Sequence, residues 1–360
     1  MKILNQGFDH VEFVVGDLAK HGKMYTRMGF EKVGSRKLPE LGLESDVWAQ
    51  GFVRIILTKI TDEKKAAKDP RSAFFKRHGD GICVLAIEVD DCKAWFNHTT
   101  SKGAKTALKP TTYTSDAGSV TRAEIYTPED LRYAFVERKQ KKEGYSNPAL
   151  LDHDLVMSRL ESPSPKGIRV IDHLTNNVDM GEMTKWSKFY QDVFGFGVTR
   201  HYKISTGRTG LISDVIQSPD HKIKVPINEA TEKESQVQEF VTRFKGAGVQ
   251  HLALLTVDLP HTLNSLRDEE FKFLTVPHTY YEAVPTRIKG VTEDLKEMER
   301  LGILLDGEGE GYLLQIFSEE LVGPFFMEYI QRKGNQGFGE GNFKALFEAI
   351  ERDQVRRGVL

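Results

Sequence analysis

Two histidines and one glutamate are the residues of this chain whose types and spacing best suit chemistry on a metal ion. His173, His251 and Glu328 each stand in a short apolar segment typical of a strand, and they are separated by 78 and 77 residues. Two imidazoles and one carboxylate on one face of a metal leave about three adjacent positions open, as in non-haem Fe(II) oxygenases. The same set can hold Zn(II), Mn(II) or Ni(II), so the residue types favour iron without excluding the others.

The segment around His251 indicates which element must position such a ligand. Residues 248–255 form a short apolar run that predicts a buried strand, preceded by a glycine-rich turn and followed by Pro260. Gln250 and His251 lie at its start, where a core strand has no packing reason to carry an imidazole. A single histidine of this kind is more often a hydrogen-bonded core residue than a ligand, so the metal interpretation depends on the other two positions.

The chain carries an internal duplication. A strand pattern with a helix after it occurs at His10 and again at His173, and the offset between the copies is nearly constant. It is 163 residues from His10 to His173 and 168 residues from Ser45 to Ser213. Each copy is therefore predicted to begin with a strand and a helix and to continue as several strands.

Each copy serves as a control for the other. We match the three candidate ligands of the second copy with His10, Val84 and Glu137 of the first copy. A valine stands where the central histidine would be, so the first copy has lost one member of the set. We therefore expect the active metal site in the second copy and a degenerate site in the first.

The predicted organisation has two modules. Residues 1–150 form the N-terminal module with the degenerate site, residues 151–170 form a turn-rich linker, and residues 171–360 form the C-terminal catalytic module. The glycine-rich segment 334–341 resembles a phosphate loop, but it lacks the Gly-Lys-Ser/Thr ending, so we reject that interpretation. It precedes a predicted terminal helix, which is either a packed tail or a lid that closes a pocket.

Composition excludes several classes of function. The chain has 360 residues, a net charge of −2 and 39% hydrophobic residues, which describes an ordinary globular protein of about two domains. The near-neutral balance argues against nucleic acid as a partner. No apolar run approaches the roughly 20 residues that span a bilayer, and the N-terminus shows no signal-peptide pattern. The chain has only two cysteines, so we expect no disulfide framework. We expect a cytoplasmic location, where thiols stay reduced.

Aromatic and amide side chains accompany the candidate ligands. Gln315 and Phe317 share one face of a predicted strand by its period of two, and Phe326 shares a face with Glu328. A pocket lined in this way suits a substrate that bears a ring, with amides for a phenol or a carboxylate. Ordinary core packing explains the two phenylalanines equally well when they are considered alone.

Several motifs in one order resemble the vicinal oxygen chelate superfamily and, within it, the family of 4-hydroxyphenylpyruvate dioxygenases. The resemblance covers essentially the whole chain. It implies an α+β fold of two tandem duplicated modules, each a βαβββ-type repeat that forms an open barrel, with the C-terminal helix as a lid. The motifs that carry it are Ile171-Asp172-His173, Pro226-Ile227-Asn228-Glu229, residues 246–253, residues 313–317 and residues 337–343.

The resemblance also implies roles for individual residues. Positions matching His173, His251 and Glu328 bind one Fe(II) per chain. Positions that bind substrate match Ser213, Asn228, Gln236, Gln250 and Gln315. Positions that wall the substrate site match Phe317, Phe326, Phe338 and Phe343. By strand alternation Gln250 points away from His251 unless the strand bends there.

The activity implied is conversion of 4-hydroxyphenylpyruvate, a 2-oxo acid, and O2 to homogentisate and CO2, a step of tyrosine and phenylalanine catabolism. The family suggests a homodimer or homotetramer. The alternatives are a 4-hydroxymandelate synthase, an extradiol dioxygenase and a metal-free binding protein of the same fold. An intact set of three ligands argues against the last of these.

Overall fold

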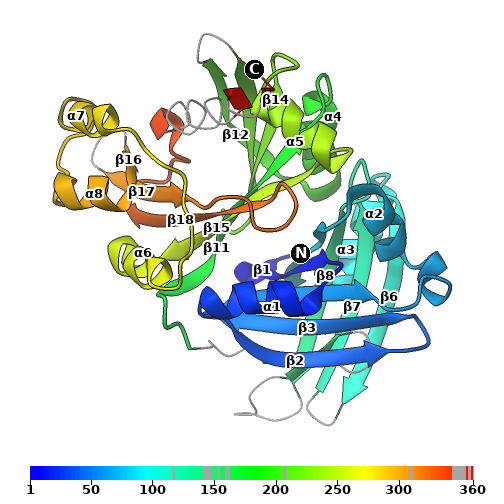
Figure 1. The fold of residues 1–360 in the computed structure, drawn as a ribbon. Coiled ribbons are helices and arrows are strands. Elements are labelled where there is room, and N and C mark those ends of the chain that lie inside the picture. Colours follow the sequence, from blue (N-terminus) through cyan, green and yellow to red (C-terminus); the bar gives the residue numbers. More distant parts are fainter. Residues whose placement is uncertain are drawn as a thin grey trace.

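The computed structural model describes residues 1–115, 118–140, 148–151, 155–158, 163–205, 209–307 and 311–342, with a few more near the C-terminus. Two eight-stranded sheets dominate this part of the chain, one from each half of the sequence, and they lie side by side (Figure 1). We call residues 3–140 the first module and residues 168–333 the second module.

The first module has the strand order β2-β3-β4-β1-β5-β8-β7-β6. Its strands are β1 (Ile3–Val14), β2 (Glu31–Leu38), β3 (Leu43–Gln50), β4 (Val53–Ile60), β5 (Gly81–Val89), β6 (Thr106–Ser115), β7 (Gly118–Tyr126) and β8 (Arg132–Gln140). Its helices are α1 (Leu18–Arg27), α2 (Pro70–His78) and α3 (Cys92–Ser101), with a short 3-10 turn at Lys65–Lys68.

The second module repeats this order as β12-β13-β14-β11-β15-β18-β17-β16. Its strands are β11 (Ile168–Val178), β12 (Gly197–Ser205), β13 (Gly210–Gln217), β14 (Lys224–Ala230), β15 (Gly248–Thr256), β16 (Leu304–Asp306), β17 (Tyr312–Phe317) and β18 (Phe326–Lys333). Its helices are α4 (Met183–Phe189), continued by a π-helical turn at Tyr190–Phe194, then α5 (Gln236–Phe244), α6 (Leu259–Arg267), α7 (His278–Arg287) and α8 (Leu295–Leu301).

Each module is built from two similar units joined at its centre. In the first module β1 runs parallel to β4 and antiparallel to β5, and β5 runs parallel to β8. In the second module β11, β14, β15 and β18 are related in the same way. The prediction of two tandem α+β modules of the vicinal oxygen chelate type is thereby confirmed, with the repeat present twice inside each module.

Aspartate caps begin the helix that follows the first strand of three of the four units. The side chains of Asp17, Asp91 and Asp258 each accept a hydrogen bond from a backbone N–H in the first turn of α1, α3 and α6. Such a cap typically stabilises a helix by about 1 kcal/mol. In the second module the cap of α6 fixes where the chain leaves β15, the strand that carries His251.

The two modules share one core. Phe13 of β1 meets Phe325, just before β18, edge-to-face with ring centroids 5.1 Å apart. The hydroxyl groups of Tyr133 and Tyr190 are 3.1 Å apart, across the interface. Apolar side chains of both modules belong to a single buried cluster, so each module covers apolar surface of the other.

A hairpin of β9 (Pro148–Leu151) and β10 (Leu155–Ser158) spans the predicted start of the linker at residue 151, and β11 begins at Ile168, before the predicted end of the linker at residue 170. At the other end, Asn342 is described but Phe343 and the predicted helix stripe beyond it lie outside the described residues, so the lid stays a prediction. None of the helices formed by described residues is long and apolar enough to cross a membrane.

Strand register corrects one match between the modules. Ala253 of β15 pairs with Glu328 of β18, and at the same place in the first module Ala86 pairs with Ala134. The match of Glu137 with Glu328 is therefore wrong, and the first module lacks the carboxylate as well as the central histidine. Helices α7 and α8 lengthen the second module before β16, which shifts the offset between the copies there. Glu137 instead accepts a hydrogen bond from the backbone N–H of Cys92 at the start of α3, at 3.0 Å.

Candidate metal centre

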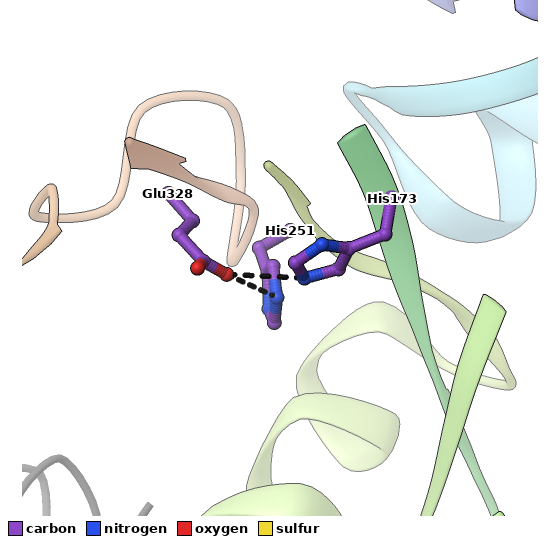
Figure 2. Close-up of side chains that lie close together, drawn as sticks. All are labelled: His173, His251 and Glu328. Carbon is purple, nitrogen blue, oxygen red and sulfur yellow. Dashed lines mark ion pairs between the residues drawn. The ribbon is translucent and has the colours of Figure 1, made fainter. Parts of the chain in front are cut away.

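Three neighbouring strands of the second module bring His173, His251 and Glu328 together (Figure 2). We call these residues the metal triad. Their candidate ligand atoms all lie within 4.8 Å of one another, and all three side chains are buried. Nε2 of His173 and Nε2 of His251 lie 3.2 and 3.3 Å from the same carboxylate oxygen, Oε2 of Glu328. One ion can therefore contact two nitrogens and one oxygen from a single side.

Strand register explains this convergence. His173 pairs with Ala253, and Ala253 pairs with Glu328. His173, Ala253 and Glu328 therefore form one row across β11, β15 and β18. His251 lies two residues before Ala253 on β15, and residues two apart point to the same face. The methyl group of Ala253 leaves space between the side chains of the two outer strands.

Each imidazole is held by a hydrogen bond at Nδ1, the ring nitrogen that faces away from the triad. Nδ1 of His173 is 2.8 Å from Oδ2 of Asp172, and Nδ1 of His251 is 3.0 Å from Oε1 of Gln250. A carboxylate or an amide oxygen can only accept, so each Nδ1 carries the proton and donates it. Each Nε2 keeps its lone pair for a metal, as is usual for histidine ligands.

Gln250 reaches His251 because β15 bends at this point. The register with β11 skips Gln250: Thr175 pairs with His251, but the next residue, Asn176, pairs with Val249. This is a β-bulge, which redirects side chains locally. The contact of Gln250 is with the imidazole of His251, the neighbour that strict alternation would have placed on the opposite face.

The electrostatics of the triad suit a cation. Burial would raise the pKa of Glu328, but the two histidines outweigh it and lower this pKa to about 2. Burial lowers the pKa of His251. Burial would also lower the pKa of His173, but Glu328 and Asp172 outweigh it and raise that pKa. Glu328 thus favours positive charge beside its buried carboxylate, and a divalent cation would supply that charge.

A chain of hydrogen bonds extends from Glu328 to the C-terminal segment. Nε2 of Gln315 donates to Oε1 of Glu328 at 3.1 Å, and Oε1 of Gln315 accepts from Nδ2 of Asn342 at 3.0 Å. Oδ1 of Asn342 lies 2.5 Å from the hydroxyl of Tyr280 in α7. Gln315 thus orients the carboxylate and is itself held at its other end.

Three phenylalanines surround the triad. Phe326 stacks on His251 with ring centroids 5.0 Å apart, Phe317 lies 6.0 Å from the same ring, and Phe338 lies 5.2 Å from His173. Phe317 and Glu328 are cross-strand partners, as are Phe326 and His251. The side chains of Phe317 and Phe326 therefore stand on the same face of the sheet as the triad, and Phe338 approaches it from the segment after β18.

A second polar group lies further along the same sheet. Ser213 of β13 pairs with Asn228 of β14, which pairs with Asn177 of β11. Nδ2 of Asn228 donates to Oδ1 of Asn177 at 3.3 Å. Among the described residues, no hydrogen-bond partner is found for the Ser213 hydroxyl, the Asn228 Oδ1 or the Asn177 Nδ2. Buried polar atoms without partners are costly, so these atoms suit the polar end of a ligand.

Sequence reasoning placed some of these residues and missed others. Gln236 is the buried first residue of α5, and Phe343 lies outside the described residues. Asn177 was missed, although the period of two from His173 through Thr175 leads to it. Three further missed residues hold ligands or their partners: Asp172, Arg332 and Asn342.

The first module fills the corresponding face with ion pairs. Glu12 of β1 occupies the place of Thr175, and its carboxylate lies 2.6 Å from Arg71 and 3.6 Å from Arg122. Glu124 lies 2.7 Å from Arg122 and 2.5 Å from Arg132. Several buried guanidinium groups in this space repel a cation, and two of the three ligand positions hold Val84 and Ala134, so the described residues of this module form no equivalent metal site.

The comparisons with known proteins agree with this geometry. Residues 170–284 match the family model of the glyoxalase/bleomycin resistance protein/dioxygenase superfamily. Residues 3–144 match the model described as hydroxyphenylpyruvate dioxygenase, N-terminal. The fold and these matches define the class: a tandem vicinal oxygen chelate protein.

Individual relatives narrow the class. A 4-hydroxyphenylpyruvate dioxygenase of Legionella pneumophila (strain Corby) is 39% identical over 98% of this chain and 96% of its own length. One from Pseudomonas aeruginosa is 36% identical with the same coverage. The solved structure of a variant 4-hydroxymandelate synthase from Streptomyces coelicolor superposes with a TM-score of 0.84 at 26% identity, covering 98% of this chain and all of that one. The chain belongs to the 4-hydroxyphenylpyruvate dioxygenase family.

Proposed function

We propose that this chain is an Fe(II)-dependent dioxygenase that converts 4-hydroxyphenylpyruvate and O2 to homogentisate and CO2. One observation carries the proposal: two imidazoles and one carboxylate converge within 4.8 Å in a chain whose relatives bear the name of this enzyme. A facial set of this kind is typical of non-haem Fe(II) oxygenases.

The metal triad would hold one Fe(II) per chain. When bound, Fe(II) supplies adjacent open positions at which a 2-oxo acid and O2 can meet. Asp172 and Gln250 keep the imidazoles in the tautomer that binds metal, and Gln315 keeps the carboxylate of Glu328 turned toward them. The protein contributes orientation of the ligands, and no side chain is required as a general acid or base.

Two groups of residues would bind the substrate. The rings of Phe317, Phe326 and Phe338 form an apolar wall that orients an aromatic ring and excludes water. Ser213 and Asn228, together with Asn177, offer both donors and acceptors for a phenol. We assign Gln236 and Phe343 to the substrate site on the family resemblance.

Product analysis tests the proposal. The purified chain is loaded with Fe(II) under argon, given 4-hydroxyphenylpyruvate and then exposed to air. Homogentisate with one CO2 per O2 consumed is the expected result. A binding protein without activity would consume no O2, and either that outcome or a product other than homogentisate overturns the assignment.

The second candidate is 4-hydroxymandelate synthase, because a variant of that enzyme has this fold at 26% identity. It uses the same substrate and oxidises the benzylic carbon instead of the ring. The same reaction mixture separates the two, because homogentisate and 4-hydroxymandelate elute at different positions in chromatography. The names of the relatives favour homogentisate.

We place the reaction in tyrosine and phenylalanine catabolism and the enzyme in the cytoplasm, where its two buried free thiols, Cys83 and Cys92, remain reduced. We also propose a homodimer or homotetramer. Light scattering of the iron-loaded protein measures the number of chains directly.

A further inference from the structure

Arg332, at the end of β18, contacts both the support of a candidate metal ligand and the C-terminal segment. Its Nε and Nη2 donate to the two carboxylate oxygens of Asp172 at 2.8 and 2.7 Å. Oδ2 of Asp172 also accepts the hydrogen bond from Nδ1 of His173. Arg332 therefore holds the carboxylate that orients His173, and Nζ of Lys224 lies 3.5 Å from Oδ1 of the same carboxylate.

The third nitrogen of the same guanidinium group holds the turn after β18. Nη1 of Arg332 donates to the backbone carbonyl of Asn335 at 3.1 Å and to that of Gly337 at 2.7 Å. The guanidinium carbon lies 5.8 Å from the ring centre of Phe338, the residue whose ring meets His173. All three donor nitrogens are in use, two toward the metal triad and one toward residues 335–338.

The first module shows which of these contacts are common to both modules. Asp9, His10 and Arg138 repeat the arrangement: Nδ1 of His10 lies 2.6 Å from Asp9, and both Nη atoms of Arg138 donate to the Asp9 carboxylate. This module keeps the support although it lacks the other two ligands, so the Asp–His–Arg contact alone does not indicate metal binding. In the second module the guanidinium is turned, so that Nε replaces one Nη at the aspartate and Nη1 is directed to the chain after β18.

We propose that Arg332 is a positioning residue that couples the metal triad to the C-terminal segment 335–342, so that metal binding and docking of this segment stabilise each other. The inference rests on the proposed function in that it treats the triad as a metal site. Coupling is reciprocal: if docking the segment strengthens metal binding, bound metal must strengthen docking by the same factor. Arginine is needed because lysine, with one ammonium group, cannot hold a carboxylate through two nitrogens and two carbonyls through a third.

The test measures metal affinity and segment mobility together, without turnover. Co(II) is the probe, because its visible absorption reports both affinity and ligand geometry, and amide hydrogen exchange of peptides covering 334–342 reports docking. In the unmodified protein, Co(II) should slow exchange in this segment. Arg332→Lys should bind Co(II) about tenfold more weakly or worse, with an altered spectrum, faster exchange in 334–342 and no slowing by Co(II).

Two further variants make the result decisive. Arg138→Lys removes the same kind of contact in the first module and should change neither Co(II) affinity nor exchange in 334–342. Asn335→Ala leaves Arg332 on Asp172 but removes the side-chain oxygen that accepts from the Gly337 N–H at 2.6 Å, so it should loosen the segment and weaken Co(II) binding. If Arg332→Lys does not fold, the Co(II) affinity and the exchange of Asn335→Ala still test whether the segment and the metal triad are coupled.

Wild-type Co(II) affinity in both Arg332→Lys and Asn335→Ala would overturn the proposal. So would weaker affinity in Arg332→Lys with an unchanged exchange response, because Arg332 would then act on His173 alone. Neither result depends on which product the enzyme makes. An absence of homogentisate with intact coupling would refute the proposed function and leave this inference standing.

Discussion

Gln315 donates a hydrogen bond from its amide nitrogen to Oε1 of Glu328, the carboxylate oxygen that does not face the two histidines. The other end of the same amide accepts from Asn342. Oε2 of Glu328 therefore faces the two imidazoles, and Oε1 accepts a hydrogen bond from Gln315. The Gln315 side chain is fixed in turn by its hydrogen bond from Asn342.

Replacing Gln315 with methionine should weaken metal binding by about tenfold or more, because the carboxylate loses the partner that orients it. Metal affinity is measured by anaerobic Fe(II) titration of the purified protein. Gln50→Met is the matched control: Gln50 is an equally buried amide in β3, hydrogen-bonded to the Met28 carbonyl at 2.8 Å. The control should lose stability and keep its iron, and equal iron affinities in the two variants would contradict the role of Gln315.

Single substitutions of the metal triad should abolish iron binding. His173→Ala, His251→Ala and Glu328→Ala are each expected to contain no iron after loading, whereas wild type is expected to contain one iron per chain. His10→Ala and Glu137→Ala should keep the iron, since the first module fills its equivalent space with ion pairs. Metal analysis together with circular dichroism checks both groups, and loss of iron from a folded first-module variant would show that the two modules have been assigned the wrong roles.

Gly339→Ala should disturb the centre through sterics. Gly339 has φ +75°, and a Cβ there would overlap the side-chain oxygen of Gln315, which is already engaged with Asn342. Gly103 offers a control because it has φ +96° with nothing within 4 Å of an added Cβ. Both alanines incur backbone strain of about 1 kcal/mol or more, but only Gly339→Ala should lower iron affinity. Equal iron affinities in Gly339→Ala and Gly103→Ala, measured at one temperature at which both are folded, would show that Gln315 can move aside without weakening iron binding.

The ion-pair cluster of the first module should make stability depend on pH. Burial would raise the pKa of Glu12, but Arg71, Arg122 and Arg36 outweigh it and hold this pKa well below its usual range. The ionised form therefore stabilises the fold above the unfolded-state pKa of about 4.3, and this contribution is lost as pH falls toward the lower folded-state pKa.

Glu12→Gln should accordingly destabilise the protein by about 3–5 kcal/mol at pH 7, because it leaves buried arginines uncompensated. The difference from wild type should narrow as pH falls below about 4. Urea unfolding followed across this pH range measures it. A difference that stays constant with pH would mean that Glu12 is not ionised in the folded protein.

Residue patterns predicted the duplication and the metal triad because both depend on local periodicity and residue type. The match of Glu137 with Glu328 failed because a short Phe-x-Glu similarity cannot reveal that α7 and α8 lengthen one module before its last strands. Only the ladder pairings of Ala86 and Ala253 identify Ala134 as the equivalent residue.

The contact of Gln250 could not be predicted from alternation, because the bulge that redirects it is set by pairing between β11 and β15. Arg332 was missed for a related reason. A charged residue at a strand end usually faces solvent, and its link to Asp172 joins positions 160 residues apart. By contrast, Asn177 follows from the period of two and could have been predicted together with His173.

The order of strands in the second module has a consequence for synthesis of the protein. His173 lies on the module's first strand, β11, and Glu328 on its last, β18, and the two meet only through β15 between them. A chain still emerging from the ribosome can offer two imidazoles long before it offers the carboxylate. Ligation by all three residues must therefore await synthesis of β18, so a metal ion bound there would stabilise a second module that has already formed its sheet and would not nucleate its folding.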